Sequence, residues 1–263
     1  MSATLRVTYY TAARGTTVAL KISSSLTGGF SRVANRNGAV LALAYVALGL
    51  VWQVAFYSAF VTWLQETNPE TTGVPLPTIE IPLAVSATVA AVTLLLLQVA
   101  AIVSLRTFVG GHTDRIPSEY YTRNIIVVLA NALVGSLVYG LLVFFGSLLF
   151  LVPGIVAYVA FTFMLVYIAV EDENFVAALR DSWHLTRDNW LPLFALLLIT
   201  AVALSLVPWT VAALVSFIVG AYAGPAASTL VSGVITLPFS LLLLGILAEA
   251  FVQLRDDPAP ADV

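Results

Sequence analysis

Few residues of this chain could do chemistry within its long apolar runs. The ionisable side chains in or beside those runs are Arg106, Glu171 and Glu249. Because a charge inside a bilayer is costly, such a residue is a candidate for ion coupling, proton transfer or catalysis. Glu249 could instead form a structural ion pair at the membrane interface with Arg106, Arg123 or Arg187 from a neighbouring helix. The positions of the three side chains near the ends of the runs favour the structural pair.

Metal and nucleophile chemistry have little support in the sequence. His112 and His184 stand in different polar stretches without an HExxH motif, so the sequence predicts no zinc site of the usual kinds. The absence of cysteine excludes disulfides, thiolate catalysis and iron–sulfur clusters. No GxSxG elbow of a serine hydrolase is present. We therefore predict no catalytic residue, no cofactor and no metal.

The composition indicates what kind of scaffold positions these residues. The chain has 263 residues, of which 60% are hydrophobic and 10% are charged. A soluble domain is about half apolar and about a quarter charged, so the excess apolar surface must face lipid. The apolar runs are long and unbroken, which is typical of spanning helices and not of barrel strands. The sequence predicts an all-α polytopic transmembrane bundle.

We expect about six spans arranged as three helical hairpins. The expected spans are residues 39–64, 81–105, 124–149, 151–170, 190–206 with a possible extension to 223, and 226–251. They form a membrane domain over 38–254, between an N-terminal segment, 1–37, and a tail, 255–263. The candidate helix-break positions are Pro153, Gly154 and Pro208. Pro153-Gly154 indicates a tight turn or a helix start, and three spans instead of two after residue 190 is the open alternative.

The basic residues predict the orientation. In the six-span arrangement all eleven Lys and Arg residues fall on one side, and the loops on the other side hold none. The positive-inside rule then places both termini in the cytoplasm of a multi-pass cell-membrane protein. A reporter fused at Val263 that proved external would contradict this arrangement.

The cytoplasmic interface is where we expect specific contacts. Residues 174–185 have helical periodicity with one apolar face, which predicts an amphipathic helix in the headgroup plane or packed on the helix ends. An Arg and an Asn precede three of the expected spans, at Arg36-Asn37, Arg123-Asn124 and Arg187–Asn189. This pattern indicates either a repeated hairpin or the general preference for a basic residue and an N-cap there. The candidate interface residues are Arg106, Arg123, Glu171, Arg180, Ser182, Trp183, Arg187 and Glu249.

One stretch resembles a known group of proteins. It contains Leu151-Val152-Pro153-Gly154, then Glu171-Asp172, then Ala178-Leu179-Arg180-Asp181-Ser182-Trp183. This pattern resembles six-helix integral membrane proteins related to the membrane domain that accompanies glycerophosphodiester phosphodiesterases, a largely uncharacterised group common in salt-loving archaea. The resemblance covers about 40 residues directly and implies the six-span layout. It implies no catalytic residue.

These observations leave three functional hypotheses. The first is a non-enzymatic, lipid-associated scaffold or accessory subunit. The second is an uncoupled permease for a small apolar or amphiphilic solute, motivated by the proline positions and by polar residues within the spans. The third is an intramembrane lipid-modifying enzyme, which has the least support. The expected partners are membrane lipids and a protein partner or a second copy of the chain. Nucleic acid is not expected, and a small-molecule ligand is not identified.

Overall fold

The computed structural model describes residues 20–70 and 73–256, and this part of the chain is helical without strands. The helices are α1 (Ile22–Val33), α2 (Arg36–Thr67), α3 (Leu83–Val109), α4 (Glu119–Thr122), α5 (Ile125–Leu149), α6 (Leu151–Ala160), α7 (Met164–Val170), α8 (Phe175–Thr186), α9 (Trp190–Thr236) and α10 (Phe239–Asp256). The predicted all-α bundle is confirmed.

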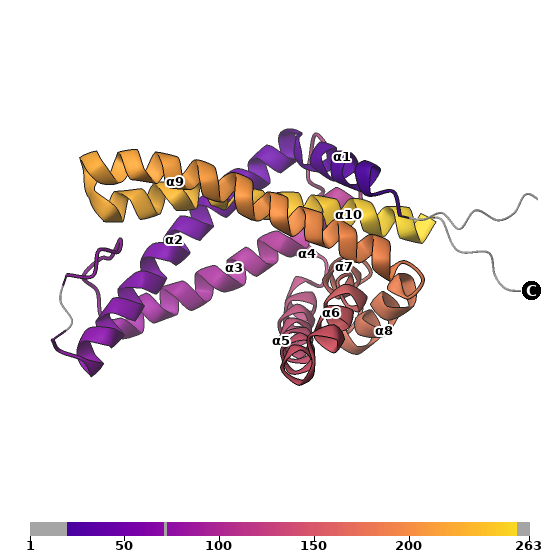
Figure 1. The fold of residues 1–263 in the computed structure, drawn as a ribbon, viewed down its shortest axis with the longest axis horizontal. Coiled ribbons are helices and arrows are strands. Elements are labelled where there is room, and N and C mark those ends of the chain that lie inside the picture. Colours follow the sequence, from indigo (N-terminus) through magenta and orange to yellow (C-terminus); the bar gives the residue numbers. More distant parts are fainter. Residues whose placement is uncertain (1–19, 71–72, 257–263) are drawn as a thin grey trace, which may run out of the picture.

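Three helical hairpins make up the membrane part (Figure 1). The first is α2 with α3, and the second is α5 with α6 and α7. The third lies within the apolar stretch Trp190–Asp256, which is the last of five segments long and apolar enough to cross a membrane. That stretch reverses at Gly224, whose φ of 85° is outside the helical region. The two arms then run side by side, and Ser216 Oγ donates a hydrogen bond to the carbonyl of Ser228 at 3.1 Å.

Pro208 was expected to break a helix, and this expectation is wrong. The residue is buried inside the first arm of α9, and the arm continues as a helix up to Gly224. A proline removes one backbone donor, but helices that span a membrane tolerate prolines where surrounding groups satisfy the freed carbonyl. The reversal that does occur uses the positive φ of Gly224, which glycine adopts without a steric penalty. Because the first arm is one continuous helix from Trp190 to this glycine, the structure shows no additional span between Pro208 and Gly224.

The fourth expected span, 151–170, is interrupted. α6 ends at Ala160 and α7 begins at Met164, so three residues between them are not helical. Pro153 and Gly154 lie in the first turns of α6, which agrees with the helix-start interpretation. A Cβ at Gly154 would collide with the backbone and side chain of Ser147 in α5. This glycine therefore permits the close approach of α5 and α6.

The core gathers where the hairpins meet, and we call this region the hub. It consists of α1, Ala101–Phe108 of α3, Phe163–Val170, α8 and Leu241–Leu254 of α10. Its largest buried apolar side chains include Phe108, Phe163 and Phe251, each at most 1% exposed. Away from the hub, the tips of the three hairpins diverge (Figure 1). Their apolar side chains are exposed there, as lipid-facing positions must be.

Helix α1 belongs to the hub. Residues 1–37 were expected to form an N-terminal segment outside the membrane domain, and the structure describes this segment from Leu20 onward. α1 packs along α10 with Ser25 and Gly29 buried. A Cβ at Gly245 would lie 2.7 Å from the carbonyl oxygen of Gly29. Two glycines thus bring the backbones of α1 and α10 close together.

Candidate functional site

Arg106 is the most buried charged residue of the hub. It sits in the last turn of α3 and is 2% exposed. Its Nε donates to the carbonyl of Ala169 at 2.6 Å, and one terminal nitrogen donates to the carbonyls of Tyr120 (2.9 Å) and Arg123 (3.0 Å). The other terminal nitrogen contacts Asp172 at 2.7 Å. The guanidinium therefore joins the ends of α3, α4 and α7.

Asp172 completes this cluster from the turn between α7 and α8. One carboxylate oxygen accepts from Arg106, and the other contacts Arg123 Nε at 3.0 Å and Asn124 Nδ2 at 3.2 Å. The turn gives Asp172 a φ of 57°, a left-handed conformation that Asp tolerates better than most residues. Asp172 was not among the predicted interface residues. Its signals were its place in the motif that carries the family resemblance and in the acidic run from Glu171 to Glu173.

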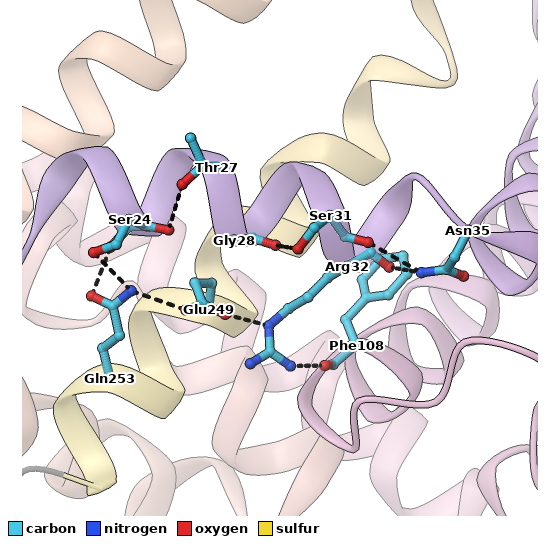
Figure 2. A network of polar contacts seen from close by, with 10 residues as sticks. Ser24, Thr27, Gly28, Ser31, Arg32, Asn35, Phe108, Glu249 and Gln253 are labelled. Carbon is cyan, nitrogen blue, oxygen red and sulfur yellow. Dashed lines mark hydrogen bonds and ion pairs between the residues drawn. The ribbon is translucent and has the colours of Figure 1, made fainter.

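Glu249 pairs with Arg32 and not with the arginines expected for it. Arg32 Nε lies 2.6 Å from Glu249 Oε2, and another nitrogen of Arg32 donates to the carbonyl of Phe108 at the end of α3. Figure 2 shows this contact from α1 to α10, with Gln253 donating to the other Glu249 oxygen at 3.0 Å. Both charged side chains are 18% exposed. The pairing with Arg106, Arg123 or Arg187 predicted from the sequence is therefore wrong.

The other predicted interface charges are exposed and weakly connected. Glu171 contacts Arg255 at 3.2 Å, and each side chain is 42% exposed. Arg187 Nε lies 3.4 Å from Oδ2 of its chain neighbour Asp188, and both side chains are exposed. Arg180 is exposed and makes no ion pair within the described residues. Such pairs contribute little to stability.

Ser182 bridges the interruption between α6 and α7. Its hydroxyl donates to the carbonyl of Ala160 at 2.8 Å and accepts from the backbone N–H of Phe163 at 3.2 Å. Thr186, one turn later on α8, donates to the same Ala160 carbonyl at 3.1 Å. Both residues are fully buried. Helix α8 thus satisfies backbone groups that the broken helix leaves free.

Trp183 lies on the same stretch of α8 but on its outer side. The side chain is 38% exposed and its ring packs near those of Phe161 (6.0 Å between centroids) and Trp190 (5.3 Å).

Three of the predicted interface residues, Arg106, Arg123 and Ser182, lie at junctions between helices. Among the described residues, no group of three His, Asp or Glu side chains could hold a metal ion.

Replacing Ser182 with alanine is expected to lower the free energy of unfolding by about 1–3 kcal/mol, because the Phe163 N–H then stays buried without a partner. Thr186→Val should lower the free energy of unfolding by less, since the Ser182 hydroxyl still donates to the Ala160 carbonyl. The double variant should cost more than the sum of the single changes. Titration with SDS in mixed micelles measures the effect. Ser31→Ala is the control, because exposed Ser31 bonds only to a carbonyl of its own helix; an equal loss there would contradict the role of Ser182.

Glu173 carries the hub's unpartnered carboxylate oxygen. Its Oε2 is buried and makes no hydrogen bond. Burial, together with the nearby charges of Asp181 and Glu171, raises the pKa of Glu173 from 4.5 to about 7. The protonated form is thus favoured in the folded protein, so stability from this group is full below about pH 4.5 and is lost as the pH rises through 7.

The variant Glu173→Gln should therefore be more stable than the parent protein at pH 8, by about 1 kcal/mol because solvent screens a partly exposed charge. The difference should vanish near pH 5. Thermal unfolding in detergent across this pH range measures it, with the exposed residue Glu119→Gln as the control. A variant that stays equally stable at pH 8, or gains most at pH 5, would refute this account of Glu173.

A groove opens beside the hub where two elbows of the chain face each other. One elbow joins α1 to α2 and the other joins α9 to α10. The groove has a volume of about 530 Å³, and its lining residues are Val33, Ala34, Asn35, Arg36, Gly38, Ala39, Ala42, Pro238, Phe239 and Leu242. Asn35 caps α2 by accepting from the Gly38 N–H at 3.0 Å. A Cβ at Gly38 would collide with the carbonyl of Val33, so the tight first elbow depends on this glycine.

Comparison with known proteins gives a family but no activity. No curated protein and no solved structure matches the chain. Residues 20–254 match the family described as a domain of unknown function, DUF7847. The match begins just before α1 and ends within α10, so it takes in the hub and all three hairpins. The protein is therefore a multi-pass membrane protein that belongs to the DUF7847 family.

Proposed function

We propose that this protein is a non-enzymatic, lipid-associated scaffold or accessory subunit of the cell membrane, with both termini in the cytoplasm. One observation carries the proposal. The buried polar side chains of the hub, such as Arg106 and Ser182, bond to helix ends, and neither lines the groove beside the hub. The groove beside the hub is lined mainly by apolar side chains. Groups bonded in this way stabilise the packing of the helices, and the groove offers a lipid an apolar surface.

The activity side of the proposal is tested with the purified full chain in mild detergent. Phospholipids with radiolabelled headgroups and acyl chains are incubated with the protein, and the products are separated by chromatography. Intact lipids that co-purify without turnover support the proposal. Steady release of labelled product would refute it, and loss of that release in Glu249→Gln would restore the enzyme hypothesis.

The orientation can be tested separately because the chain contains no cysteine. A single cysteine at Asn68 follows α2 at the hairpin tip, whereas one at Ser118 precedes α4 at the hub. With the termini inside, an impermeant maleimide added to intact cells labels the first and spares the second. The opposite labelling pattern would place the hub outside the cell.

A permease is the second candidate, and the interrupted return arms of two hairpins support it. The breaks lie between α6 and α7 and between α9 and α10. Broken spans mark substrate sites in many transporters. At the first break, however, Ser182 and Thr186 already occupy the free backbone groups. Solute flux into proteoliposomes would favour the permease over the scaffold.

A further inference from the structure

We infer that the groove between the two elbows binds one phospholipid with an anionic headgroup, which contacts Arg36 while an acyl chain lies against the apolar wall. This inference rests on the proposed lipid association and assigns it a place. The groove volume of about 530 Å³ falls within the roughly 300–1,000 Å³ typical of small-molecule sites. An amphiphile is the ligand whose two ends match the two kinds of lining.

The polar end of the groove is defined by Arg36. Its side chain is exposed and makes no ion pair within the described part of the chain. It is the single charged residue among those lining the groove. A guanidinium matches the oxygens of a phosphate in a two-pronged contact. Arg36 also begins α2, so the positive end of that helix dipole lies at the same place.

The position of the groove places Arg36 at headgroup depth. The neighbouring Asn37 donates its backbone N–H to the carbonyl of Thr113 at 3.2 Å and its side-chain amide to the carbonyl of His112 at 2.8 Å. These residues belong to the polar stretch that follows α3. The start of α2 is thereby held against the polar end of a neighbouring span, where headgroups lie, while Ala39 and Ala42 continue into the apolar part of α2.

Both elbows contribute to the apolar wall. Phe239 and Leu242 of α10 line the groove together with Ala39 and Ala42 of α2. The small alanine side chains on one side leave the space that the chain of a lipid would fill. Burial of methylene groups there stabilises a bound lipid in proportion to the area that is covered.

The charge distribution argues for local recognition and against a general attraction. At the hub ends of the spans, the described residues include equal numbers of basic and acidic side chains. A neutral surface does not concentrate anionic lipids by its overall field. Preference for an anionic headgroup must then come from an unpaired cation beside an apolar groove, which is the arrangement at Arg36.

The test uses the full chain in detergent and native mass spectrometry, with dioleoyl phosphatidylglycerol and dioleoyl phosphatidylcholine as probes. The parent protein should retain phosphatidylglycerol in preference to phosphatidylcholine. Arg36→Gln should weaken retention of phosphatidylglycerol by about tenfold, as expected for loss of one charge-assisted contact, and leave phosphatidylcholine unchanged. Ala39→Phe, which fills the groove from an exposed position, should weaken retention of both lipids.

Two variants serve as matched controls. Arg180→Gln removes an exposed, unpaired cation outside the groove, and Ala47→Phe enlarges an exposed alanine of α2 outside the groove. Both should retain lipid like the parent protein. Unchanged retention in Arg36→Gln and Ala39→Phe would overturn the site, as would equal losses in the controls. Neither result involves lipid turnover, so failure of the site is distinct from failure of the proposed function.

Discussion

Replacement of Arg106 by methionine is expected to destabilise the protein by about 3–5 kcal/mol, the usual cost of removing one partner of a buried ion pair. The change leaves the Asp172 carboxylate without its closest cation and three backbone carbonyls without a donor. Because these groups sit at the ends of three helices, the loss should appear as a shift of the whole unfolding transition in SDS titration.

The control for this change is Arg180→Met, which removes an exposed arginine without an ion pair and should shift stability by less than about 0.5 kcal/mol. Arg106→Lys should fall between the two, because lysine keeps the charge but has fewer donors in a different geometry. Adding Asp172→Asn to Arg106→Met should recover part of the loss by removing the uncompensated charge. Equal stability of the Arg106 and Arg180 variants would show that the cluster does not hold the hub.

The features that could be predicted from the sequence depend on local patterns. Apolar runs of sufficient length predicted the hairpins, since backbone groups in lipid must bond within a helix. The start of the helix expected over 174–185 was also predicted closely. In the structure Asn174 is the N-cap of this helix and accepts from the Val176 and Ala177 N–H groups. The last reversal was also expected, because the expected spans leave residues 224 and 225 between them and the structure reverses at Gly224. The continuity through Pro208 was not predicted, because a proline usually interrupts a helix.

The three similar Arg and Asn positions show why local patterns were insufficient for the site. Asn37 donates to the carbonyl of His112, whereas Asn124 has a left-handed φ of 49° and donates to Asp172, and the side chain of Asn189 makes no capping bond. The same residue type serves different partners because the surrounding helices differ. Whether the hairpins arose by duplication stays a prediction.

The hub itself depends on contacts between distant parts of the chain. Arg32 and Glu249 are separated by 217 residues, and no periodicity indicates which of several arginines a given acid will meet. Residues 161–163, where the helix is interrupted, include no proline or glycine that would predict the interruption. It is stabilised by Ser182 and Thr186 from another helix, so it could be recognised only once α8 was placed.

Reversal of the charge at Arg32 should release α1 from α10. In Arg32→Glu two carboxylates would face each other at a site where each native side chain is 18% exposed, and the carbonyl of Phe108 would lose its donor. A cost of about 3 kcal/mol is expected for a pair at this depth. The opening of α1 should then become about a hundredfold more frequent.

Ser25, which is fully buried between α1 and α10, provides the measurement, because a cysteine placed there would be the single thiol of the chain. Its reaction with maleimide should be slow in the parent background and about a hundredfold faster in Arg32→Glu. Arg36→Glu, an exposed charge reversal four residues further on, should leave the rate unchanged. The exchanged pair, Arg32→Glu with Glu249→Arg, should slow the reaction again, because opposite charges face each other once more. If the exchanged pair reacts as fast as Arg32→Glu alone, the ion pair does not hold α1 and the glycine contacts with α10 must do so.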